Sequence, residues 1–316
     1  MGFKRYVLKR LLLLFPVLLG VSVISFSLVH FVPGGPVEAA LGTQGNPELI
    51  QELRNQYGLN RPLYVQYFDW LTDVLQGDFG QSIRTERDIS VAVERAIPPT
   101  FWVAFSASVV SVLIGIPTGI ISAVNHYSAR DYVATFFAFL GLSVPNFFLG
   151  LALILVFGLY IGGLPTTGFV DPMKHPIEGV RHLVLPAFTL GTASSAVVMR
   201  MMRSSLLEVF SEEYIRTAKA KGLTRRLITN KHAVKNALIP TITVIGLNFG
   251  YLLGGVVIVE QIFAIPGLGR LTLTAIFNRE YRVIQATLLL IAFLFAVVNL
   301  VTDIMYAYLD PRIKYE

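Results

Sequence analysis

Hydrophobic residues of this chain gather into six long runs that are separated by polar segments. The first run, Leu11–Val32, has 22 residues, enough to cross a bilayer core about 30 Å thick at roughly 1.5 Å per residue. Only helices and closed barrels satisfy the backbone in lipid, and these runs are too long and too uniformly apolar for barrel strands. We therefore predict an all-α polytopic membrane protein with six transmembrane helices, over residues 11–32, 101–124, 132–161, 183–203, 241–259 and 286–309.

Proline and glycine add detail to three of these predicted spans. The third run is too long for one straight crossing and is interrupted at Pro145-Asn146, where we predict a kink. Gly115 and Gly119 in the second run form a small-xxx-small pair suited to close helix contact. The fifth run carries glycines at strict four-residue spacing, which we interpret as a packing face rather than a substrate groove: Gly246, Gly250 and Gly254.

The segment 33–97 differs from the runs around it. It holds five arginines and nine acidic residues, a net charge of −4. Asn46-Pro47-Glu48 can cap a helix that stops at Gly58, and 63–76 predicts a second, partly amphipathic helix that ends before Gly77. About 65 residues is small for an independent core, so we expect this segment to pack on the membrane domain as an extracytoplasmic helical insertion.

Charge asymmetry orients the chain. Residues 1–10 carry four basic residues and no acid, and the stretch from Arg200 to Lys235 has nine Lys or Arg against three acids. Cytoplasmic loops carry such an excess of positive charge, which predicts both termini inside and segment 33–97 outside. No signal-peptide cleavage site is evident, so we interpret the first run as an uncleaved helix.

Composition supports the membrane assignment. Hydrophobic residues make up 54% of the 316 residues and charged residues 15%, with a mean hydropathy of +0.62. In a membrane protein the net charge of +6 marks the cytoplasmic side rather than nucleic-acid binding. The chain has no cysteine, which excludes disulfides, thiolate catalysis and cysteine metal sites.

The basic loop between the fourth and fifth runs, residues 212–240, has helix signals of its own. Ser211 can cap a helix over 212–221 that stops at Gly222, where we expect a positive φ. Thr224 can cap a second helix that ends at Pro240. We expect the small side chains of the loop to let another surface come close: Ala218, Ala220, Ala233 and Ala237.

This loop resembles the cytoplasmic coupling loop of ABC-importer membrane subunits, in particular their dipeptide, oligopeptide and nickel branch. The coupling loop then spans 204–240, a knob that sits in a cleft of a separate ATPase subunit. A solvated basic loop that only orients the protein is the alternative. The resemblance rests on Glu213, Tyr214, Thr217, Ala218, Ala220, Lys221, Gly222, His232, Asn236, Ala237 and Pro240.

Other phrases extend this resemblance over nearly the whole chain, and it implies the type I ABC importer fold in a prokaryotic cell membrane. It also implies partners: a second homologous permease subunit, two ATP-binding subunits and an extracytoplasmic substrate-binding protein. ATP and Mg would bind those ATPases, so no cofactor and no catalytic residue is expected in this chain. The phrases are 32–36, 58–67, 77–82, 260–271, 278–281 and 310–312.

The implied function is ATP-driven import of di- or oligopeptides, with nickel complexes or sugars as alternatives. No GxxxxGK[ST], HExxH or GxSxG motif occurs, and the five histidines show no ligand spacing, so we expect no metal. A secondary transporter or channel is the other class that fits, although ionisable residues in the spans are sparse. Ser143, Asn146 and Asn248 are candidates for the translocation path, and we favour structural roles for Glu260 and Asp303.

Overall fold

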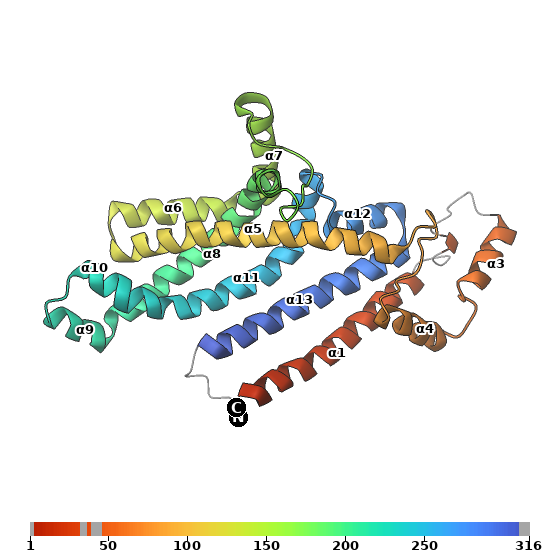
Figure 1. Cartoon of the computed structure of the whole chain (residues 1–316), viewed down its shortest axis with the longest axis horizontal. Helices are drawn as coiled ribbons and strands as arrows, with labels where there is room; N and C mark the ends of the chain where they lie inside the picture. The colour runs from red at the N-terminus through yellow and green to blue at the C-terminus, as the bar shows by residue number, and fades with distance from the viewer. Residues whose placement is uncertain (1–2, 32–36, 39–45, 310–316) are drawn as a thin grey trace.

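The computed structural model describes residues 3–31, 37–38 and 46–309, and every regular element within these ranges is helical. The long helices lie roughly along the longest axis of the molecule (Figure 1). One isolated bridge, Gln81–Asp88, is the only strand-like pairing in the described part of the chain. The all-helical prediction is therefore confirmed, while the phrases at 32–36 and 310–312 lie outside the described residues.

Five helices are long and apolar enough to cross a membrane, and a sixth span exists if one bent pair counts as a single crossing. The bent pair is α6, Ala129–Ser143, and α7, Asn146–Leu155, which continues as the π-helix η2, Val156–Ile161. The five long helices are α1 Phe3–His30, α5 Ile89–Val124, α8 Pro176–Ser211, α11 Val234–Ile262 and α13 Tyr281–Leu309.

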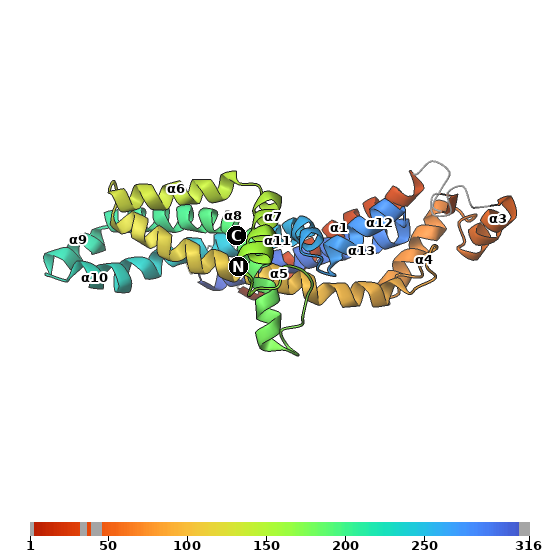
Figure 2. The ribbon, with the colours of Figure 1, turned by 90° about the horizontal axis from the view of Figure 1, so that it is seen from above.

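The break between α6 and α7 confirms the predicted kink at Pro145-Asn146. The two helices meet at 96°, so that α7 and η2 stand across the other helices rather than along them (Figures 1 and 2). Proline disfavours the helical conformation of the residue before it, and Val144 is extended with ψ of 120°. Pro145 then caps the second half of the pair.

The long helices extend beyond the apolar runs that predicted them, most of all α5 and α8. α5 begins at Ile89 instead of 101, because the Asp88 carboxylate accepts a hydrogen bond from the Ser90 N–H at 2.7 Å. α8 covers 176–211 instead of 183–203, with Pro176 in its first turn. In both helices the added turns contain charged residues, such as Glu94 and Arg95 in α5 and Glu178 in α8, which lower the hydropathy of a window there.

Close contact between α5 and α8 confirms the prediction for the glycine pair of the second span. A Cβ on Gly115 would lie 2.7 Å from the Ser195 carbonyl oxygen, and one on Gly119 would lie 2.7 Å from that of Met199. Only glycine allows the two backbones to approach so closely. These contacts make α5 and α8 one rigid unit that carries the loops at both of its ends.

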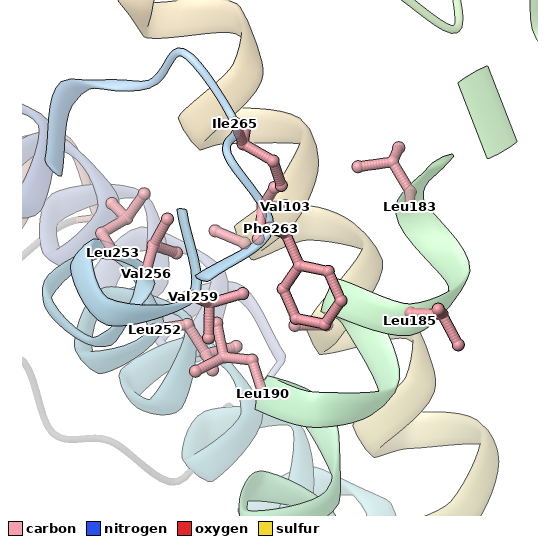
Figure 3. Close-up of a cluster of buried hydrophobic side chains, with 12 residues drawn as sticks. Val103, Leu183, Leu185, Leu190, Leu252, Leu253, Val256, Val259, Phe263 and Ile265 are labelled. Carbon is pink, nitrogen blue, oxygen red and sulfur yellow. The ribbon is translucent and has the colours of Figure 1, made fainter. Parts of the chain in front are cut away.

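The main hydrophobic core forms where α5, α8 and α11 meet. Figure 3 shows Phe263, just after α11, inserted between side chains of α8 and α5. Val103, Leu190, Val256 and Phe263 in this cluster are all buried. The core therefore lies near the middle of the chain's long axis, between the two polar ends of the molecule.

The three glycines of α11 have different surroundings. A Cβ on Gly246 would come 2.3 Å from the Thr302 side chain, and one on Gly250 would come 3.1 Å from Phe295, both on α13. At Gly254 nothing lies within 4 Å. The predicted packing face is thus confirmed for the first two glycines, whereas Gly254 faces open space.

The insertion helices α3, Pro47–Gln56, and α4, Leu63–Leu75, match their predicted bounds closely. The Asn46 side chain accepts a hydrogen bond from the Leu49 N–H at 2.6 Å, and Gly58 has a φ of +64°. The Ser22 hydroxyl of α1 bonds the Tyr67 hydroxyl of α4 at 2.8 Å. The expectation that this segment packs on the membrane helices is confirmed by that contact.

Glu260, at the end of α11, holds the following helix α12, Leu268–Asn278. Its carboxylate is fully buried, accepts the Arg270 N–H at 2.9 Å and accepts the Thr100 hydroxyl of α5 at 2.5 Å. The same Thr100 oxygen accepts the Leu268 N–H at 2.8 Å. Since α12 begins after a glycine, which has no side chain to cap it, Glu260 and Thr100 act as its cap.

Candidate functional site

The basic loop lies at one end of the molecule, opposite the insertion helices α3 and α4 (Figure 1). After α8 ends at Ser211, the chain forms α9, Glu213–Ala220, and then a glycine turn. A single turn, α10, Arg225–Leu227, and the π-helix η3, Ile228–Ala233, lead directly into α11. The loop is thus two helical arms joined at Gly222.

Two details of the prediction for this loop are wrong. Ser211 does not cap α9, because it belongs to the last turn of α8 and donates its hydroxyl to the Glu208 carbonyl; Glu212 is the cap residue. Pro240 does not end the second arm, since α11 continues through it. Proline removes one N–H only, and the buried face of Ala233, Ala237 and Thr241 runs on past it.

The turn at Gly222 is a Schellman cap. Its φ is +77°, as expected, and the Gly222 N–H donates to the Lys219 carbonyl at 3.0 Å. The Leu223 N–H donates to the Ala218 carbonyl, five residues back, at 3.3 Å. These two bonds are the 5→2 and 6→1 pairs that define the motif, and the left-handed residue between them is normally glycine.

The inner face of the loop is packed against its own chain. Ile215 and Ala218 of α9 meet Ala233 and Ala237 in a cluster that also includes Met202 of α8. Three of the four alanines expected to admit a partner are therefore buried within the loop and hold its arms together. Only Ala220 of that group is exposed.

The outer face carries most of the residues that the resemblance singled out. The Asn236 amide of the second arm donates to the Tyr214 hydroxyl of the first arm at 2.7 Å and to the His232 carbonyl at 3.2 Å. The structure thus brings three of the predicted residues together across the loop. Exposed on this face are Glu213, Tyr214, Thr217, Ala220, Lys221, Gly222 and Asn236, while His232 and Pro240 are half-buried.

A polar cluster behind the loop was not predicted. Asp131, at the start of α6, is buried, and Arg203 of α8 donates to its two carboxylate oxygens at 3.0 and 2.9 Å. Arg203 also donates to the Ser122 hydroxyl at 2.8 Å, and Arg225 of α10 donates to the Val124 carbonyl. The α5–α6 turn is therefore bonded to both α8 and the loop. The sequence signal that could have indicated this cluster is an acidic residue, Asp131, that directly follows a short turn.

The three candidate path residues do not form a common site. Ser143 is exposed at the end of α6 and Asn146 is half-buried at the start of α7, and no hydrogen bond joins either to Asn248. The Asn248 amide nitrogen of α11 is buried without a hydrogen-bond partner among the described residues. Their role in a path stays a prediction. No cluster of His, Asp or Glu in the described ranges could hold a metal ion.

These features define a class of protein. The chain is a multi-pass helical membrane protein in which a rigid α5–α8 unit ends in a compact, basic, two-armed loop with an exposed polar face. The hydrophobic residues of the loop pack inside it, so its exposed face is mainly polar.

The chain belongs to the family of binding-protein-dependent transport system inner membrane components. The family model of that description matches residues 115–315, and the model for the N-terminal part of these membrane components matches residues 3–101. It is therefore a multi-pass inner-membrane component of a transport system.

Curated relatives match the chain along almost its full length. It is 40% identical to the dipeptide transport system permease protein DppB of Alkalihalophilus pseudofirmus, over 98% of this chain and 99% of the relative. It is 42% identical to the glutathione transport system permease protein GsiC of Salmonella choleraesuis, with the same coverage. The GsiC protein of Escherichia coli K12 is 41% identical.

Solved structures share the fold. The MetNI methionine ABC transporter, in inward-facing conformations, superposes with a TM-score of 0.57 at 18% identity, covering 69% of this chain and 96% of the other. An amino acid ABC transporter gives a TM-score of 0.52 at 13% identity, covering 69% and 94%. The predicted type I ABC importer fold is confirmed.

Proposed function

We propose that this chain is one of two membrane-spanning subunits of an ATP-driven importer of short peptides. The observation that carries the proposal is the match along 98% of the chain to transport proteins named for a dipeptide and for glutathione, itself a tripeptide. Both named substrates are short peptides, which favours peptides over nickel complexes and sugars.

The importer would contain a second, homologous permease, two ATP-binding subunits and an extracytoplasmic binding protein. ATP and Mg would bind the ATPases, and this chain would hold no cofactor and catalyse no reaction. The exposed face of the basic loop, residues 212–240, would sit in the ATPase cleft on the cytoplasmic side. The Schellman turn and the α5–α8 unit give a rigid connection through which ATPase closure could turn the helices.

The test is co-purification of the ATPases with full-length variants of this chain. Ala220 is exposed, so Ala220→Trp adds bulk to the contact surface without disturbing the packing inside the loop. Mismatch in a packed contact costs about 1–3 kcal/mol, and each kilocalorie lowers association about fivefold. We expect ATPase recovery and ATP-dependent dialanine uptake to fall, whereas Lys174→Trp, exposed on another loop, leaves both unchanged.

Two results would contradict the proposal. One is full ATPase recovery and uptake with Ala220→Trp, which would make the loop an orientation signal only. The other is uptake by the purified chain without any ATPase, which would place it among secondary transporters or channels.

A further inference from the structure

A cavity of about 360 Å³ lies at the end of the molecule opposite the basic loop. Its walls come from three separate segments: the end of α1, the insertion helices α3 and α4, and the start of α13. Aromatic rings, Phe26, Tyr57, Trp70 and Phe79, share these walls with charged and amide side chains. The volume falls in the range of about 300–1,000 Å³ that is typical of small-molecule sites.

Arg282 and Gln285 are the residues of α13 that line this cavity, and of these two only Arg282 carries a positive charge. It is half-buried, and its guanidinium stacks over the Tyr57 ring at 4.0 Å from the ring centre. It makes no hydrogen bond and no ion pair with the described residues, so its N–H donors are unused. A Cβ on Gly80 would lie 3.3 Å from the Arg282 Nη1 atom, which means that glycine at this position leaves room for the guanidinium.

Acidic residues also line the cavity. Asp73 and Asp78 are close enough to attract the Arg282 guanidinium, although neither forms an ion pair with it. Asp69 is paired with Arg61 at 3.0 Å. Among its described lining residues, the cavity therefore presents the Arg282 cation and the Asp73 carboxylate without an ion pair, together with the Asp78 carboxylate, which accepts only the Gly80 N–H at 2.7 Å.

The walls of the cavity are fixed before any ligand enters. Both ring nitrogens of His30 make contacts, Nδ1 with the Phe26 carbonyl at 3.0 Å and Nε2 with the Gln66 amide oxygen at 3.1 Å. The Gln66 amide nitrogen donates to the carbonyls of Leu59 and Arg61 at 3.1 and 2.7 Å. These bonds tie α1 to the α3–α4 connection, and a site that is already ordered loses less entropy on binding.

We propose that this cavity is a binding site of the permease itself for short zwitterionic peptides. Arg282 would bind the free carboxylate through its planar pair of N–H groups, Asp73 and Asp78 would attract the α-ammonium group, and the aromatic rings would contact the side chains. The inference rests on the proposed peptide function. It adds a site on this chain that binds the peptide after the binding protein has released it.

The first experiment needs no mutation. Full-length chain in lipid nanodiscs, without binding protein, is titrated with dialanine, N-acetyl-dialanine and dialanine amide by calorimetry. We expect dialanine to bind and the amide to bind at least about tenfold more weakly, because a charge-assisted bond to Arg282 is lost. N-acetyl-dialanine, which lacks the α-ammonium group, should bind at least about threefold more weakly than dialanine. Absence of dialanine binding, or equal binding of dialanine and its amide, overturns the proposal.

Variants then locate the site. Arg282→Gln should weaken dialanine binding about tenfold or more and remove the preference over the amide. Arg279→Gln is the matched control, since Arg279 is exposed three residues away and does not line the cavity; it should bind like the unmodified chain. Asp73→Asn with Asp78→Asn should remove the preference over N-acetyl-dialanine. Variants that keep both preferences overturn the proposal.

Uptake by the assembled importer separates this inference from the proposed function. If the unmodified importer takes up dialanine with ATP and Arg282→Gln reduces this uptake, both the peptide function and the site in the cavity are supported. Uptake that Arg282→Gln leaves unchanged overturns the site and keeps the peptide function. If Arg282→Gln weakens only docking of the binding protein while dialanine still binds, the cavity is a docking contact and the proposed peptide site is wrong. No peptide uptake by the unmodified importer overturns the peptide function.

Discussion

At Gly222 a single backbone angle determines the shape of the basic loop. The φ of +77° is accessible to glycine, and a residue with a Cβ pays about 1 kcal/mol or more to adopt it. Nothing lies within 4 Å of the position a Cβ would take, so the penalty is conformational and not a clash. The bend between the two arms is thus encoded by one residue.

We predict that Gly222→Val lowers ATPase co-purification about fivefold or more, because the strained turn no longer holds the exposed face of the loop together. The control is Gly77→Val, where φ is +84° and the surroundings are equally open but the residue lies in the insertion. It carries the same strain and should retain the ATPase. Equal ATPase loss in both variants would show that the effect is general destabilisation.

Gly267 serves a different purpose, since its φ is −100° and any residue could adopt that backbone. What requires glycine is space: a Cβ there would lie 2.1 Å from a carboxylate oxygen of Glu260. Glu260 in turn caps α12 and bonds Thr100 of α5. The cap that Glu260 provides for α12 therefore depends on the space that Gly267 leaves for its carboxylate.

We predict that Gly267→Ala and Glu260→Ala each lower the thermal stability of the detergent-solubilised chain. Gly267→Ala displaces the carboxylate. Glu260→Ala leaves the Arg270 N–H without its acceptor, a loss of about 1–3 kcal/mol, while the Thr100 hydroxyl keeps the Ala96 carbonyl at 3.2 Å as an acceptor. The double variant should be less destabilised than the sum of the two, because the clash disappears with the side chain. Strictly additive losses would show that the two residues do not interact.

Among the elements, the α5–α6 turn and α8 are joined by a buried ion pair. Asp131 is 2% exposed and is held by Arg203, Ser122 and the Tyr127 N–H. Because α8 leads into the loop only nine residues after Arg203, this pair fixes where the first arm starts. A buried carboxylate that loses its cation is strongly destabilising.

Arg203→Met is predicted to destabilise the packing of α6 against α8 by about 3–5 kcal/mol, the loss typical of a buried ion pair from which one partner is removed. We expect faster tryptic cleavage within residues 219–235, where six Lys or Arg residues offer sites. Arg200→Met is the control, since Arg200 is exposed on the same helix and makes no hydrogen bond or ion pair with the described residues. Equal cleavage rates in Arg203→Met and Arg200→Met would show that the ion pair does not hold the start of the loop in place.

For the whole molecule, the arrangement of the ends agrees with the charge pattern. The basic loop and the insertion lie at opposite ends of the long axis (Figure 1). From the positive-inside rule we predict that residues 200–235 lie in the cytoplasm and that α3 and α4 lie outside. A chain without cysteine is well suited to test this orientation.

We predict that Gln81→Cys is labelled by a membrane-impermeant thiol reagent in intact cells and that Arg225→Cys is labelled only after the cells are opened. Both side chains are exposed, so accessibility within the protein does not differ between them. Labelling of Arg225→Cys from outside would reverse the proposed topology.

The sequence alone determined the features that depend on local order along the chain. Apolar runs of sufficient length specify spans, Pro145 specifies a break, and Asn46, Gly58 and Gly222 specify where helices start and stop, since all of these follow from backbone geometry and hydrophobicity. Most of the loop residues that the resemblance singled out are exposed on its outer face, and their contact with an ATPase stays a prediction.

The tertiary structure decided what depends on residues far apart in the chain. It joined Asp131 to Arg203 and Glu260 to Thr100, it buried three loop alanines that were expected to face a partner, and it placed Arg282 beside the insertion. Each outcome depends on which helix faces which. Hydropathy shows only which runs can cross a membrane, whereas the neighbours of a helix and its rotation are set by packing between segments far apart in the sequence.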